Sequence, residues 1–194
     1  VSLCGKAIST GFEMGDLAHI ADIPSDLSDA MTVSPLSSVI AGAEGDQAKA
    51  AILTAMDIDG SVDDFLAMDI WALAESGDQN AQQIQQVNQQ IALIMIMVQA
   101  LAATEVAEEL AALSENTATS IATQIGSNGV MNFQSVGELT AIISRAMTSS
   151  PSVTAEVIAA VADNMVDINE AMSGESADPT SPAAIDFMHT IQTT

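Results

Sequence analysis

Apolar residues recur every three or four positions over most of the chain from residue 35 onward, which is the spacing of one face of an α-helix. The clearest run follows Asp78 or Asn80, either of which can cap its start. Its apolar positions are Ile84, Val87, Ile91, Ile94 or Met95, Val98 and Leu101. The first half is apolar on one side, and the second half is apolar all round. We therefore predict the longest helix here, entering the centre of a helical bundle.

Capping residues mark shorter helices before this run. Ser34 and Pro35 predict the start of a short helix, because they suit its N-cap and first position, and two glycines end it. Asp46 is expected to cap a second helix that stops at an acidic turn. A third helix is predicted over Val62–Ser76, with Ser61 as its cap and a glycine after it.

The helical pattern continues beyond the longest run, with a bend expected near Thr104 or Ser114. A turn at Ser127–Asn132 precedes a helix predicted over about Ser135–Met147. The next helix is expected to bury a stripe formed by Val153, Val157, Val161, Met165 and Ile168. A short terminal helix is predicted at residues 183–191.

Residues 1–34 have scattered glycines and a proline, and they lack a long helical period. We predict one or two short strands and a loop, as at the end of a preceding β-rich module. No signal peptide is visible at Val1, and the missing start methionine indicates a piece of a longer polypeptide. The predicted fold class is all-α, with an extended or β-like lead-in over residues 1–34 and a helical bundle domain over 35–194.

The net charge of the chain limits the partners and the environment that suit it. The 194 residues include 26 acidic and three basic side chains, which gives a net charge of −23. Such a surface repels phosphates, so nucleic acid and anionic lipid are not expected as partners. Salt or divalent ions would screen it, which favours a marine, halophilic or calcium-rich extracellular setting over the alternative of solubility alone. Aromatic residues are only 3%, so aliphatic side chains must fill the core.

The sequence also disfavours a protein held together by an intrachain disulfide and a transmembrane protein. The single Cys4 cannot form an intrachain disulfide, and we interpret it as an inert small residue. The most apolar run, Ile91–Ala103, is shorter than the roughly 20 residues needed to cross a bilayer, so we predict a buried helix and no transmembrane segment.

The stretch DIDGSVDD, Asp57–Asp64, raises the question of a calcium loop. Aligning Gly60 with the sixth position of an EF-hand loop puts Asp59 fifth, but Ala55 then falls first and Leu66 twelfth. Because two necessary acidic ligands are missing, an EF-hand is rejected.

A looser calcium site is the remaining metal hypothesis for this stretch. Its predicted ligands are Asp57, Asp59, Asp63, Asp64 and Asp69. The alternative is an acidic turn between two helices, in which the carboxylates of the first helical turn favour the helix dipole without any metal.

No catalytic constellation is recognisable, and an enzyme is not expected. Two other groups of acidic residues are interpreted as solvated helix faces: Glu105, Glu108 and Glu109, and Asp163, Asp167 and Glu170. Asp186 and His189 are read as a surface pair. The uncharged glutamines between Gln82 and Gln90 either pack on a neighbouring domain or second copy, or form an exposed surface.

Several segments taken together resemble a helical module of very large secreted bacterial proteins, including calcium-rich repeat adhesins of marine bacteria. They are TVSPLSSVIAG with Ser34–Ser38, QAKAAILTAM, VDDFLAMD with Val62, Asp64 and Asp69, and the helix with Val87, Asn88 and Gln89. The resemblance covers residues 1 to about 103. Serines replace the usual threonines, and Ile70 stands where proline would follow the aspartate.

This resemblance implies a secreted or cell-surface role without catalytic residues. We expect a non-enzymatic structural or adhesive module, acting as a spacer or protein-interaction domain, with other domains of the same polypeptide or surface proteins as partners. The alternatives are a self-assembling filament or layer subunit, hence a homo-oligomer, and a small-ligand or peptide binder with a pocket lined by methionines such as Met95 and Met97.

Overall fold

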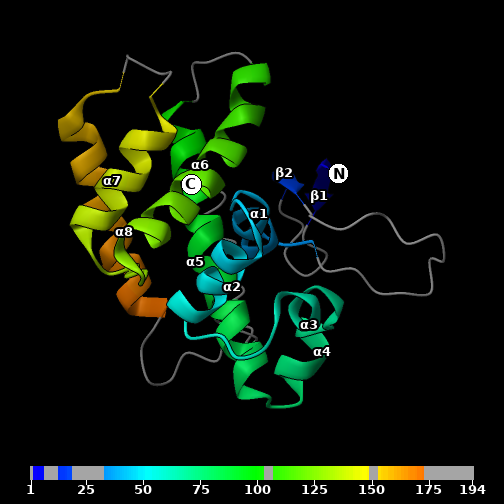
Figure 1. The fold of residues 1–194 in the computed structure, drawn as a ribbon. Helices are drawn as coiled ribbons and strands as arrows, with labels where there is room; N and C mark the ends of the chain where they lie inside the picture. Colours follow the sequence, from blue (N-terminus) through cyan, green and yellow to red (C-terminus); the bar gives the residue numbers. More distant parts are fainter. Residues whose placement is uncertain (1, 7–12, 19–32, 103–106, 149–152, 173–194) are drawn as a thin grey trace.

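The structure is a computed structural model that describes residues 2–6, 13–18, 33–102, 107–148 and 153–172. Within these residues, a hairpin of two strands precedes eight α-helices that pack as a bundle (Figure 1). The elements are β1 (Ser2–Lys6), β2 (Glu13–Ala18), α1 (Pro35–Ala41), α2 (Asp46–Ala55), α3 (Val62–Ala67), α4 (Ile70–Glu75), α5 (Gln79–Leu101), α6 (Ala107–Asn128), α7 (Val136–Ala146) and α8 (Ala155–Met172). The predicted all-α fold class, with a β-like N-terminal segment, is confirmed.

The N-terminal strands pair in an antiparallel hairpin. Ser2 lies opposite Ala18 and Cys4 opposite Asp16, with an irregularity in the register between Cys4 and Lys6. β2 lies against α1 and α6, beside the start of the bundle (Figure 1). The hairpin therefore rests on the helices that follow it.

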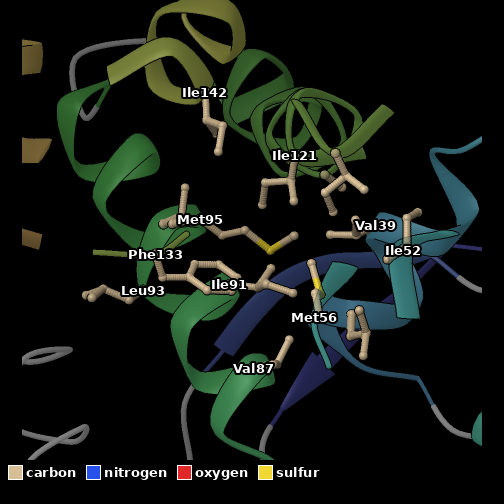
Figure 2. Packing of buried hydrophobic residues seen from close by; sticks show 14 of the residues in the cluster. Val39, Ile52, Met56, Val87, Ile91, Leu93, Met95, Ile121, Phe133 and Ile142 are labelled. Atoms are coloured by element: carbon tan, nitrogen blue, oxygen red, sulfur yellow. The ribbon is translucent and has the colours of Figure 1, made fainter. Parts of the chain in front are cut away.

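α5 forms the centre of the hydrophobic core, as its sequence pattern predicts. Every residue from Ile91 to Met95 is buried, whereas the first half of α5 buries one side around Ile84 and Val87. Figure 2 shows Ile91 and Met95 of α5 pointing toward side chains of other elements, namely Val39, Met56 and Ile121. Burying one large aliphatic side chain contributes about 1.5–3 kcal/mol, so this helix is the main apolar scaffold.

α1 is a short helix that is buried along its length between α5, α6 and β2. Ser34 caps it as predicted: its hydroxyl accepts from the Ser37 N–H, and the Ser37 hydroxyl accepts from the Ser34 N–H in return. The Leu36 N–H is satisfied by Asn88 of α5, whose Oδ1 accepts it at 3.0 Å. All of this polar capping is buried, which lets a seven-residue helix occupy the interior.

The single helix predicted over Val62–Ser76 is wrong, because the chain forms α3 and α4 instead. Met68 is extended (φ −81°, ψ 134°) and ends α3. Asp69 then begins α4, accepting the Ala72 N–H at 3.1 Å with its carboxylate. An internal N-cap thus competes with continuation of the helix, and Ile70 occupies the first helical position, where proline is favoured in general.

Of three other predicted helix starts, that of α2 is shifted by one residue and those of α5 and α7 are confirmed. Gly45, with φ 83°, is the N-cap of α2, and Asp46 is the first helical residue. Asp78, not Asn80, caps α5 by accepting the Ala81 N–H at 2.9 Å. The predicted start of α7 at Ser135 is confirmed by the hydrogen bond that its hydroxyl accepts from Glu138.

The continuous pattern after α5 forms a separate helix, α6, which packs against α5. The Gln99 amide donates to the Ser114 hydroxyl at 2.8 Å, so Ser114 joins the two helices and does not bend one. Thr104, the other predicted bend, lies outside the described residues, as do Glu105, Asp186, His189 and the predicted helix at 183–191.

The predicted buried stripe of α8 is also wrong in part. The buried face consists of Ile158, Ala162, Met165, Asn169 and Met172. Of the predicted stripe, Met165 is fully buried and Val157 is 45% exposed. The other three members are half-buried against the core: Val153, Val161 and Ile168. α8 packs on α7 and α5 through a face rotated by about one residue from the valine stripe, which is therefore left at the edge of the contact.

Candidate functional site

The acidic stretch forms a tight connection between α2 and α3. The chain leaves α2 through Asp57, which adopts φ 56°, and Ile58 returns to the core, where it is buried. The Ile58 N–H donates back to the Leu53 carbonyl at 3.0 Å. Gly60 has φ 111°, a conformation that side chains rarely adopt, so the glycine is required for the turn into α3.

Asp64 closes this turn as part of a capping box. Its Oδ2 accepts from the Ser61 N–H at 3.1 Å and from the Ser61 hydroxyl at 2.6 Å, and the Asp64 N–H donates to that hydroxyl. The hydrogen bond from the Ser61 hydroxyl, and then that from the Ser61 N–H, hold the pKa of Asp64 below its usual range. This carboxylate therefore has a defined structural role.

Side chains at the start of α5, which are distant in sequence, also hold this turn in place. Asn80 Oδ1 accepts from the Asp59 N–H at 2.9 Å, and Asn80 Nδ2 donates to the Asp59 carbonyl at 2.9 Å. Three residues further along α5, the Gln83 amide donates to the Met56 carbonyl at 3.1 Å. Two amide side chains of one helix thus bind the backbone on both sides of Asp57.

Another glutamine of α5 binds the backbone of a different segment. The Gln82 amide donates to the Ala74 carbonyl, near the end of α4, at 3.3 Å. Gln82, Gln83, Gln85, Gln86 and Gln89 are half-buried, and Gln90 is buried. Gln82 and Gln83 thus make contacts inside the same domain, which neither alternative from the sequence included.

Four of the five predicted calcium ligands lie in this connection or in the first turn of α3, whereas Asp69 lies beyond α3 at the start of α4. Asp57, Asp59, Asp63, Asp64 and Asp69 are all exposed. Asp64 caps α3 and Asp69 caps α4. Over the part of the chain that the structure describes, no three His, Cys, Asp or Glu side chains are grouped so that they could hold a metal ion. Calcium binding stays a prediction that rests on the sequence.

The methionines offered as pocket residues belong to the core or its edge. Met95 is buried and lies among Ile91, Ile121 and Val39 in Figure 2. Met97 is half-buried against the same core. Asp163, Asp167 and Glu170 are exposed on α8, as the interpretation of a solvated face predicts.

Asn169 is a polar residue that sequence reasoning missed. It is fully buried on α8, and its amide donates at 2.7 Å to the carbonyl of Phe133, in the connection between α6 and α7. Its Oδ1 is also buried, and no described group donates to it. The signal was an asparagine four residues after Met165, on the face that α8 buries.

No protein-family model matches this chain, and no curated protein or solved structure is significantly similar to it. None of the described helices combines the length and the hydrophobicity that crossing a bilayer requires. The fold and its braced connections therefore carry the functional argument.

Proposed function

We propose that this chain is a non-enzymatic structural or adhesive module of an extracellular bacterial surface protein, acting as a spacer or protein-interaction domain. The observation that supports this best is the use of the polar side chains of α5. Asn80, Gln82, Gln83 and Asn88 each bind backbone groups of another segment of the same domain. Such bonds fix the connections between helices, which suits a unit that must keep its shape.

The surface charge supports the extracellular setting of this proposal. A net charge of −23 with three basic residues leaves the domain dependent on dissolved ions for screening. The guanidinium of Arg145, one of the three basic residues, donates to the Ser120 carbonyl at 3.0 Å. The resemblance of the first half of the sequence to modules of secreted adhesins agrees with such a setting. The proposal includes calcium binding by Asp57, Asp59, Asp63, Asp64 and Asp69.

Location is tested by labelling intact cells of the producing bacterium with an antibody raised against the purified domain. Labelling before permeabilisation is the expected result. Labelling that requires permeabilisation would overturn the extracellular role. A cytoplasmic protein of the same cells, stained in parallel, controls for leakage.

The spacer role is tested by small-angle scattering over a wide range of protein and calcium concentrations. A spacer is expected to scatter as a monomer of constant shape. If the molecular mass derived from scattering grows with the protein or the calcium concentration, the chain is instead an assembly subunit.

A further inference from the structure

The end of α6 carries an asparagine that is followed directly by a glycine. Asn128 is the last residue of α6, and Gly129 follows it with φ 75°. No other asparagine in the sequence precedes a glycine. Residues 126–130 are all exposed, and Val130 is the most exposed large apolar side chain that the structure describes, at 59%. Solvent water therefore reaches this pair.

An asparagine followed by a glycine can lose its side-chain amide without an enzyme. The Gly129 nitrogen attacks Cγ of Asn128, so a bond forms between these two atoms and the bond from Cγ to Nδ2 breaks. The proton of the Gly129 N–H leaves with the amide group as ammonia, and a cyclic succinimide remains. One water molecule then opens the ring to give aspartate or isoaspartate. Glycine favours the attack, because it has no Cβ atom and its backbone is free to turn.

The folded chain restrains this attack through one hydrogen bond. The Gly129 N–H donates to the Ile125 carbonyl at 2.7 Å. The attack requires loss of that proton and a change of the backbone at Asn128, so the hydrogen bond must open first. The ends of helices open more readily than their interiors. The rate of the reaction therefore depends on opening of the last turn of α6.

We propose that Asn128 is a modification site, where the chain deamidates spontaneously at a rate set by opening of the last turn of α6. The inference goes beyond the proposed function and does not depend on it, because the reaction needs only water. Its product places a carboxylate at the C-terminal end of a helix, where the macrodipole disfavours negative charge. Isoaspartate also adds one atom to the backbone at this point.

The modified residue lies just before a connection that joins several helices. The Met131 N–H donates to the Ala55 carbonyl of α2 at 3.3 Å, and the Phe133 carbonyl accepts from Asn169 of α8 at 2.7 Å. Both bonds require the chain to leave α6 in a fixed direction. Modification of Asn128 is therefore expected to lower the stability of the domain.

Peptide mapping of the purified whole chain tests the site. The protein is incubated in mildly alkaline buffer and then cut with a protease specific for glutamate. Cleavage after Glu115 and Glu138 releases one peptide that holds Asn116, Asn128 and Asn132. The mass increase from replacing an amide by a carboxylate is expected at Asn128 several-fold faster than at the other two. All three asparagines are exposed, so equal rates would overturn the proposal.

Two matched variants test whether the last turn of α6 sets the rate. Gly126 has open space around it, and Gly126→Ala is expected to slow the reaction at Asn128 about fourfold by favouring the helix. Gly137→Ala makes the same change in α7, where the added Cβ atom would meet only Ser135 at 3.9 Å, and should leave the rate unchanged. Equal rates in the two variants would overturn control by the last turn.

Urea unfolding tests the structural consequence. Asn128→Asp and Asn116→Asp each add one negative charge at an exposed position of α6, and the first is expected to lower the unfolding midpoint more. Incubated wild type is expected to unfold at a lower urea concentration than fresh protein, whereas Asn128→Ser should keep its midpoint. If Asn128→Ser loses as much as wild type on incubation, modification elsewhere is responsible and the proposal fails.

Discussion

Asn80 and Asp59 are joined by two hydrogen bonds of 2.9 Å that connect the first turn of α5 to the backbone of the acidic turn, 21 residues earlier. The amide group pairs with the N–H and the carbonyl of one residue, as a neighbouring strand would. It therefore fixes both the position and the orientation of the turn between α2 and α3.

Removing this clamp should cost stability without changing the fold. Asn80→Ala is expected to lower the free energy of unfolding by about 1–2 kcal/mol, because two hydrogen bonds are lost at a half-buried position. Urea unfolding followed by circular dichroism measures the change. The control is Gln79→Ala at the exposed neighbouring position, and a loss of equal size there would show that the clamp itself contributes nothing.

A close contact between α1 and α6 predicts opposite effects for two glycine substitutions. A Cβ atom on Gly42 would lie 3.2 Å from Thr119 Cα and 3.3 Å from its N, so the backbone of α6 would have to move. Gly42→Ala is expected to destabilise the domain by about 1–3 kcal/mol. Gly126 lies within α6 with open space around it, and Gly126→Ala should stabilise by up to about 1 kcal/mol. Thermal unfolding that shifts in the same direction for both would contradict the contact.

The features that were predictable depend on residues close together in sequence. The periodicity around Ile91 and the Ser34 cap are local signals, and both are confirmed by the structure. The break at Asp69 was missed although its cap is also local, because aspartate at that point can equally bind a metal or face water. The sequence therefore allows two interpretations of Asp69, as a helix cap or as a metal-binding or solvated carboxylate. Only packing in the folded structure decides between them.

Features that depend on distant partners were not predictable. α8 has apolar residues on two adjacent faces, so periodicity alone could not decide whether Val157 or Ile158 faces the core. The glutamines of α5 bind carbonyls far away in the sequence, such as that of Met56, and no pattern within α5 specifies those acceptors. The candidate site is therefore predicted in composition but not in arrangement.

The capping box makes stability depend on pH. Because the pKa of Asp64 is lower in the folded state, its contribution is present above the pKa of the unfolded carboxylate and is lost as pH falls through the folded value. Ser61→Ala removes the hydroxyl that is the main cause of the shift. The variant should be less stable than wild type at neutral pH, and the difference should shrink in acid. Chemical unfolding across the acidic range measures this, and a constant difference would contradict the linkage.

Asn169 predicts an order of stability among its variants. Asn169→Asp is expected to lose about 3 kcal/mol or more at neutral pH, because it removes the donor to Phe133 and places a charge in a fully buried site. Asn169→Leu also removes that donor but introduces no charge, and it eliminates the unpaired Oδ1. Its loss should be the smaller one in urea unfolding. Equal losses would show that Asn169 is not held in an apolar environment.

The calcium proposal predicts a melting temperature that depends on the metal. A cation held by Asp57 and Asp59 in the folded state alone would raise the melting temperature at millimolar calcium relative to EDTA, at constant ionic strength. Magnesium controls for general screening of the negative surface. The double variant Asp57→Asn, Asp59→Asn should lose the calcium-specific increase while keeping the clamp, because Asn80 binds the Asp59 backbone and not its carboxylate. Equal melts in EDTA, magnesium and calcium would reduce the stretch to an acidic turn held by Asn80 and Ser61.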